Sequence, residues 1–204
     1  MKKYIVIFAF LILSSYSVFS QEFKAGLLGG VLATQVDGDR ISGFYKAGFS
    51  GGLFVYRDYG KLSRFQAEIL YSMKGSKTSP KSTDPNLWQV STTNIDISLN
   101  YIYKLFENLH FRIGITPNVL LTSKEYSPTG IEQNPNEAPK FRNFGIVGLG
   151  GMTYFFNEKF SLTWSYNYSL YSIREGNAEI YDISLKEQNN QRHNYMSFML
   201  GYRF

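Results

Sequence analysis

The last residues of the chain carry the pattern that most restricts its fold. Residues 196–204 read Met-Ser-Phe-Met-Leu-Gly-Tyr-Arg-Phe, and every second side chain is apolar or aromatic: Met196, Phe198, Leu200, Tyr202 and Phe204. A period of two is the side-chain period of a β-strand with one apolar face. A strand in this position leaves an unpaired edge unless another strand covers it. We therefore predict that the last strand pairs with the first and closes the sheet into a barrel.

The same alternation recurs along the chain at intervals of about twenty residues. It is clear in residues 64–74, 93–104, 109–116 and 160–170, and weaker in 22–35, 44–56 and 142–155, where glycines interrupt it. Glycine inside a strand is typical of bulges and sharply bent sheet, which a small barrel requires. Together with the last strand, these segments predict an all-β chain of eight antiparallel strands that run up and down.

The predicted connections alternate between short and long. The short ones are 57–61, 105–108 and 156–159, and the longer ones, rich in Pro, Asn, Ser, Glu and Lys, are 36–43, 75–90, 123–141 and 173–192. Transmembrane barrels have short turns on the periplasmic side and long loops outside. About ten residues at 3.3 Å each, tilted by about 40°, also rise roughly the 25 Å of an outer-membrane apolar band. We expect an eight-stranded transmembrane β-barrel in the outer membrane of a Gram-negative bacterium.

Alternation alone leaves two assignments of the faces open. In a soluble, lipocalin-like barrel the apolar face points inward, whereas in a membrane barrel it faces lipid. Five or six large apolar residues on each of eight strands would overfill so narrow an interior, which favours the membrane barrel. Charged side chains then face the lumen and must be paired there. We predict a structural lumen network of Arg64, Glu68, Asp96 and Arg112.

The start of the chain predicts export. Lys2 and Lys3 precede the apolar run from Tyr4 to Leu13, and Val18 and Ser20 occupy the −3 and −1 positions of a cleavage site before Gln21. This pattern is typical of a signal peptide, and the apolar run is too short for a membrane-spanning helix. We expect a cleaved signal peptide at 1–20 and one barrel domain at 21–204.

Composition and motifs exclude several functions. The formal net charge of +5 falls to +3 once Lys2 and Lys3 are removed, which is too small for a nucleic-acid-binding protein. The chain has no cysteine, and no metal-ligand spacing or nucleotide loop is present, so we expect no cofactor and no metal. His110 and His193 are predicted at opposite ends of the barrel, His193 as a solvated rim residue, so a catalytic pair is not expected.

Four segments resemble the PorT-like outer-membrane β-barrel family. They are the opening Phe23-Lys24-Ala25-Gly26, the strand Gln66 to Gly75 that ends in Lys-Gly, the following strand Asn94 to Tyr101, and the Gly-rich Phe144 to Gly151. The similarity extends over essentially the whole mature chain and implies the fold and the location. A proline common in the middle of the family's strand at 94–101 is missing, and Ser165-Tyr166 stands where the family often has Arg-Tyr.

These observations favour a non-enzymatic protein with a structural or surface-interaction role through its long loops. The alternatives are an accessory factor in protein secretion or envelope assembly and, third, a lipid-modifying enzyme or a narrow pore. Expected partners are outer-membrane lipid, the barrel-insertion machinery, which would recognise the strand with Phe198, Leu200, Tyr202 and Phe204, and an extracellular or periplasmic protein.

Overall fold

The structure, a computed structural model, describes residues 23–39, 43–79, 89–126, 140–175 and 190–204. These residues form eight strands: β1 (Lys24–Asp37), β2 (Lys46–Tyr59), β3 (Ser63–Lys77), β4 (Gln89–Lys104), β5 (Leu109–Tyr126), β6 (Phe144–Phe155), β7 (Phe160–Ser169) and β8 (Arg192–Arg203). No helix in this part of the chain is long and apolar enough to cross a membrane. The predicted signal peptide at 1–20 lies outside the described residues.

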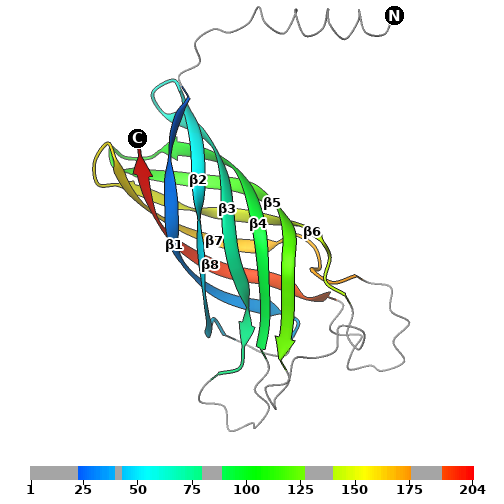
Figure 1. Ribbon diagram of the computed structural model, residues 1–204. Coiled ribbons are helices and arrows are strands. Elements are labelled where there is room, and N and C mark those ends of the chain that lie inside the picture. Colours follow the sequence, from blue (N-terminus) through cyan, green and yellow to red (C-terminus); the bar gives the residue numbers. More distant parts are fainter. Residues whose placement is uncertain (1–22, 40–42, 80–88, 127–139, 176–189) are drawn as a thin grey trace, which may run out of the picture.

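Each strand pairs antiparallel with its neighbour in sequence, and β8 pairs with β1, so the sheet closes into a barrel (Figure 1). At the closing seam Val31 is opposite Phe198 and Leu27 is opposite Tyr202. The expected closure by the last strand is confirmed. Every strand edge is therefore paired, which removes the unsatisfied backbone groups that an open sheet would expose.

Glycines permit the curvature of the wall. A Cβ added at Gly30 would lie 2.0 Å from the carbonyl oxygen of Phe198, and one added at Gly52 would lie 2.0 Å from that of Ile69. Only glycine fits where neighbouring backbones approach so closely. The glycines that blurred the alternation in the sequence are thus positions at which the sheet bends.

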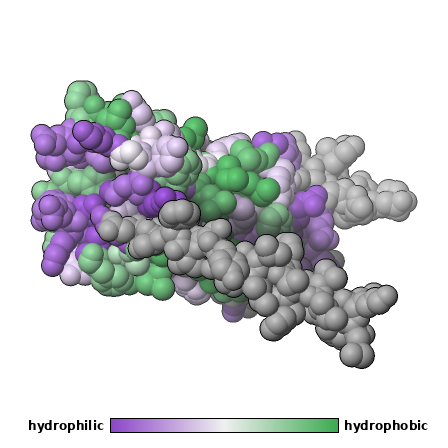
Figure 2. Space-filling model, turned by 90° about the horizontal axis from the view of Figure 1, so that it is seen from above, coloured by the Kyte–Doolittle hydropathy of each residue, from purple (hydrophilic) through white to green (hydrophobic). Residues whose placement is uncertain are grey.

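The two faces of the strands have opposite polarity. The outward positions carry large apolar side chains, with Ile69 60% exposed and Leu200 62% exposed, and Figure 2 shows hydrophobic patches along the side of the barrel. The inward positions carry polar groups, with Glu68 and Asp96 each only 3% exposed. The lipocalin-like alternative is therefore wrong, because the wall requires an apolar solvent.

The connections divide the barrel into two ends. The short turns 60–62, 105–108 and 156–159 define the short-turn end, and the four other connections leave from the opposite, loop end (Figure 1). The strands extend further than the sequence predicted: β2 reaches Tyr59, so the first turn is 60–62 rather than 57–61, and β5 reaches Tyr126. A bulge opposite Thr93 and Asn94 lets β5 continue past the point at which its alternation breaks down.

Candidate functional site

The interior of the barrel holds a group of buried charged side chains. Buried charged and amide side chains from β2 to β5 line it: Lys46, Gln66, Glu68, Lys74, Asn94, Asp96, Asn100, Arg112 and Asn118. Alternation places them inward because their strands present apolar residues to the outside. Their contacts decide whether the interior can bind or transport anything.

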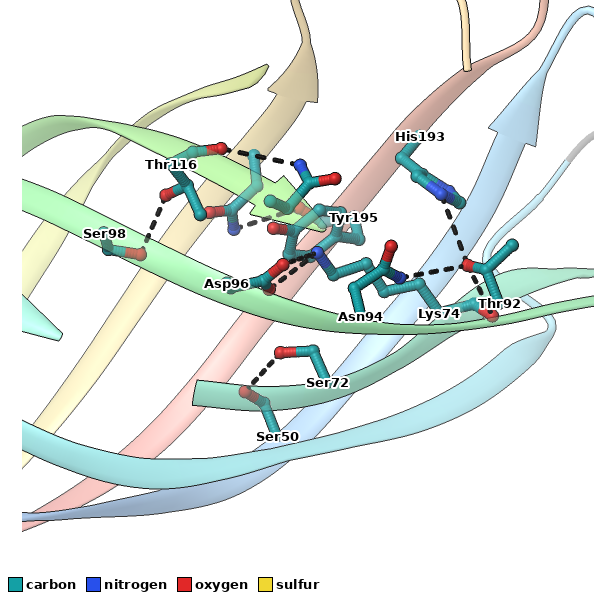
Figure 3. Close-up of polar contacts among 12 residues, drawn as sticks. Ser50, Ser72, Lys74, Thr92, Asn94, Asp96, Ser98, Thr116, His193 and Tyr195 are labelled. Atoms are coloured by element: carbon teal, nitrogen blue, oxygen red, sulfur yellow. Dashed lines mark hydrogen bonds and ion pairs between the residues drawn. The ribbon is translucent and has the colours of Figure 1, made fainter. Parts of the chain in front are cut away.

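Lys74 and Asp96 form the first buried ion pair. The Lys74 ammonium lies 2.8 Å from Asp96 Oδ1 and 2.7 Å from Asp96 Oδ2, and it stands 4.8 Å from the centre of the Tyr195 ring (Figure 3). The Lys74 side chain is 1% exposed, so the pair is fully removed from solvent. A lysine in this setting is tolerated because carboxylate and aromatic ring both stabilise its charge.

Glu68 and Arg112 form the second buried pair. Arg112 donates from Nη2 to Glu68 Oε1 at 2.8 Å, and Gln66 donates from Nε2 to the same oxygen at 2.7 Å. Arg112 lies on β5 and Glu68 on β3, so the guanidinium reaches across the inner face of β4. The pair joins β3 to β5.

The four predicted network residues do not form a single cluster. Glu68 and Arg112 meet, whereas Asp96 binds Lys74, and Arg64 donates to Asp58 at 2.6 Å near the short turn after β2. The Arg64 guanidinium also lies 4.1 Å from the centre of the Tyr56 ring. Lys74 and Asp58 are therefore partners that the sequence argument did not name.

The two histidines are separated as expected, but His193 is buried rather than solvated. It is 4% exposed, and its Nε2 lies 3.3 Å from the Thr92 hydroxyl inside the loop end (Figure 3). The prediction of a rim position failed because β8 begins at Arg192 and its alternation turns His193 inward. His110 lies at the short-turn end, edge-on to Phe155 with ring centres 4.6 Å apart.

Hydroxyl pairs and apolar side chains fill the rest of the interior. Hydroxyl groups meet across neighbouring strands at Ser50 and Ser72 (2.7 Å), Ser98 and Thr116 (2.8 Å) and Ser165 and Ser197 (2.6 Å). An apolar group lies beside them and includes Leu28, Leu32, Phe54, Leu70 and Met199. The central cavity between these groups measures about 30 Å³. That space suits a water molecule rather than a substrate.

Arg174 organises the loop end, and sequence reasoning missed it. This residue follows β7, is 1% exposed, donates from Nε to Gln191 at 2.7 Å and forms an ion pair with Glu125. Its guanidinium lies 4.0 Å from the Phe141 ring, and its carbonyl accepts from Arg142 Nε at 2.9 Å. The segments that flank the last two long connections are thereby joined.

The bulge in β5 makes this junction possible. Residues of odd number on β5 face outward as far as Val119, so an unbroken strand would also turn Glu125 outward. The bulge shifts the pairing by one residue, and Glu125 is opposite the buried Val90. One inserted residue therefore reverses the face and directs the carboxylate toward Arg174. The only signal in the sequence is the loss of alternation after Val119.

The described residues contain no group of three His, Cys, Asp or Glu side chains able to hold a metal ion. The carboxylates that face the lumen, Glu68 and Asp96, are both taken by cations of the protein.

A closed antiparallel barrel with an apolar outer wall and a polar interior that contains ion pairs is the structure of an integral outer-membrane protein. Residues 19–175 match the family described as "Outer membrane protein beta-barrel domain". The chain belongs to this family, and its location is the cell outer membrane. No curated protein matches the chain.

Two solved structures share the fold. Ail, the attachment invasion locus protein of Yersinia pestis, is 13% identical with a TM-score of 0.50, and the match covers 90% of this chain and 99% of that chain. Neisserial surface protein A is 14% identical with a TM-score of 0.50, and the match covers 89% of this chain and 97% of that chain. At this identity the likeness concerns the fold alone.

Proposed function

We propose that this barrel is a non-enzymatic scaffold that presents its long connections at the cell surface for interaction with a partner. The observation that carries the proposal is the filled interior. Two ion pairs, several hydroxyl pairs and an apolar group leave a cavity of about 30 Å³, which argues against a substrate site or a solute path there. The connections at the loop end are then the parts best suited to contact another molecule.

The loop end supports the same proposal. Arg174 joins Glu125, Phe141 and Gln191, which lie at the bases of the two longest connections. A braced base lowers the freedom of the loops that leave it, and less entropy is then lost when they bind. The contacts of Arg174 therefore support a role of these loops in binding a partner.

The alternative places the activity at the short-turn end. A cavity of about 460 Å³ opens there, and charged side chains of both signs line it, among them Arg64, Lys104, Arg203, Asp58, Glu107 and Glu158. It favours an accessory factor in secretion or envelope assembly that contacts a periplasmic protein. The resemblance to PorT-like proteins also supports this alternative. We propose that the chain is a PorT-like member of the outer-membrane β-barrel family.

A comparison of bacterial strains separates the two functions. One strain lacks the protein, one carries it with segments 127–139 and 176–189 replaced by short Gly-Ser linkers, and one carries turn variants in 105–108 and 156–159. Surface attachment and extracellular secretion are measured for each. The surface role predicts that the loop-shortened strain matches the deletion strain in attachment, with secretion intact. If only the turn variants match the deletion strain, the accessory role is correct instead.

We also propose that the outer face of β8, with Phe198, Leu200 and Tyr202, followed by Phe204, is read by the barrel-insertion machinery. These side chains lie on one outward face, and Phe204 is 72% exposed. Phe204→Ser should reduce the amount of protein in the outer membrane, whereas Phe106→Ser, which changes an equally exposed aromatic residue in a turn, should not. Equal amounts of both variants would exclude a specific role for the terminal aromatic residue.

A further inference from the structure

The lipid-facing wall has a groove that the proposed function does not use. It lies across β2, β3 and β4 near the short-turn end and has a volume of about 600 Å³. Its walls are mainly apolar and include Phe23, Val55, Tyr59, Phe65, Ala67 and Leu99. The groove is larger than the cavity at the short-turn end, about 460 Å³, and than the central cavity of the interior, about 30 Å³.

The groove exists because one small residue lies among large ones. Ala67 is opposite Val55 on β2 and opposite Leu99 on β4. The next outward residues along β3 are Phe65, 55% exposed, and Ile69, 60% exposed, so the methyl group of Ala67 forms the floor between two high side chains. The floor faces outward, as the alternation of β3 requires.

The surroundings of the groove restrict what can fill it. This wall faces the hydrocarbon of the membrane, and an unfilled furrow there would forfeit dispersion contacts with its lining. A flexible acyl chain can lie along the furrow and restore those contacts, while water cannot satisfy its apolar sides.

A cation stands at the end of the groove. Arg57 lines it, is exposed and is opposite Phe65 in the register of β2 and β3. Among the described residues Arg57 has no carboxylate partner, and no acidic side chain lines the groove. Tyr59 and Phe23 lie beside it, as aromatic residues do at the headgroup level of a membrane. A guanidinium in this position is suited to bind a phosphate bidentately.

We propose that this groove is a binding site for one glycerophospholipid of the periplasmic leaflet. One acyl chain lies over Ala67 in contact with Val55, Phe65 and Leu99, which line the groove, and the phosphodiester binds the Arg57 guanidinium. The short-turn end lies on the periplasmic side in barrels of this kind, so the phospholipid leaflet supplies the ligand. The site differs from the loops in position and in ligand, and it holds whether or not the loops bind a partner.

The test is native mass spectrometry of the folded mature chain released from micelles that contain phosphatidylglycerol or, in a second arm, diacylglycerol, which lacks the phosphate. The wild-type chain should retain one phosphatidylglycerol and less diacylglycerol. Arg57→Gln should lower retained phosphatidylglycerol about fivefold, which corresponds to about 1 kcal/mol, and leave diacylglycerol unchanged.

Ala67→Phe should fill the groove and lower retention of both lipids. Ala47→Phe, an outward alanine on the same wall at the other end of β2, is the matched control and should retain lipid as the wild type does. Gel mobility before and after boiling confirms that each variant is folded, and Arg57→Gln keeps the test valid if Ala67→Phe does not fold. Equal retention by the wild type and Arg57→Gln, loss of lipid from Ala47→Phe as well, or a second copy of the chain in place of lipid would each overturn the proposal.

Discussion

The centre of the barrel and its short-turn end contain the same kind of ion pair in different surroundings. In the centre, Lys74 and Asp96 are 1% and 4% exposed in their side chains, and Arg112 and Glu68 are 4% and 3% exposed. At the short-turn end, Arg64 is 12% exposed but its partner Asp58 is 43% exposed. The distances are alike, from 2.6 to 2.8 Å, so the surroundings rather than the geometry should decide what each pair contributes.

The comparison also bears on why the interior is charged at all. Because apolar residues occupy the outward positions of each strand, polar residues occupy the inward positions. In a narrow lumen, these polar side chains contact one another. Each central charge is acceptable only in the presence of its partner. In the interior, each buried charge therefore depends on the side chain that pairs with it. At the short-turn end, water can solvate Asp58 if Arg64 is lost.

The largest effect should come from Lys74→Met. This change leaves the Asp96 carboxylate buried without a cation and should lower the free energy of unfolding by about 3–5 kcal/mol. Urea titration of the folded chain in micelles measures it, with the folded gel band as readout. Lys74→Met combined with Asp96→Leu should recover most of the loss. A double variant that is as unstable as the single one would show that packing, rather than charge, is responsible.

Arg112→Met should have a somewhat smaller effect. Glu68 loses the guanidinium but keeps the hydrogen bond from Gln66, so we expect a loss of about 2–4 kcal/mol in the same titration. Thr116→Val is the comparison without a charge. Thr116 lies on β5, as Arg112 does, and the change removes its hydroxyl contact with Ser98 on β4. A loss no greater than that of Thr116→Val would contradict the account of this pair.

Arg174→Met tests the loop end. The loss of the contacts with Glu125 and Gln191 should lower the free energy of unfolding by about 1–3 kcal/mol. It should also accelerate proteolysis in the long connections while the barrel itself stays protected. Arg142→Met, which removes only one bond to the Arg174 carbonyl, is the matched control. Unchanged proteolysis in Arg174→Met would mean that the junction does not brace the loops.

The smallest effect is expected for Asp58→Asn at the short-turn end. Exposed pairs contribute about 0.2–1 kcal/mol, and that contribution falls further in high salt. The same titration at low and at high salt measures both properties. A loss as large as that of Lys74→Met would remove the distinction between the two regions.

The sequence predicted the faces of the barrel better than its contacts. A period of two identifies the side chains that share the inner face of each strand. Pairing each strand with the next one in sequence, and the last with the first, then gives the strand order of the barrel. The alternation does not show how far a long side chain extends along the barrel axis. Lys74 is opposite Thr92 in the register, yet its ammonium extends to Asp96, a pairing that the sequence analysis did not name.

Breaks in the alternation caused the other errors. Glu125 points inward only because of the bulge in β5, and Arg174 lies beyond the end of β7, where no period applies. His193 appeared to be a rim residue because the preceding connection is long and polar. Local irregularities of this kind depend on the pairing of distant strands, which a single strand does not encode.

The central claim is that the apolar face of each strand contacts lipid and the polar face lines a filled interior. The chain has no cysteine, so single cysteines at each position from Phe65 to Lys74 can carry a spin label without background. In the lipid-reconstituted chain, collision with oxygen should be high at Phe65, Ala67, Ile69, Tyr71 and Met73 and low at the residues between them. High collision rates with a water-soluble nickel reagent at the odd positions, or no alternation, would contradict the account.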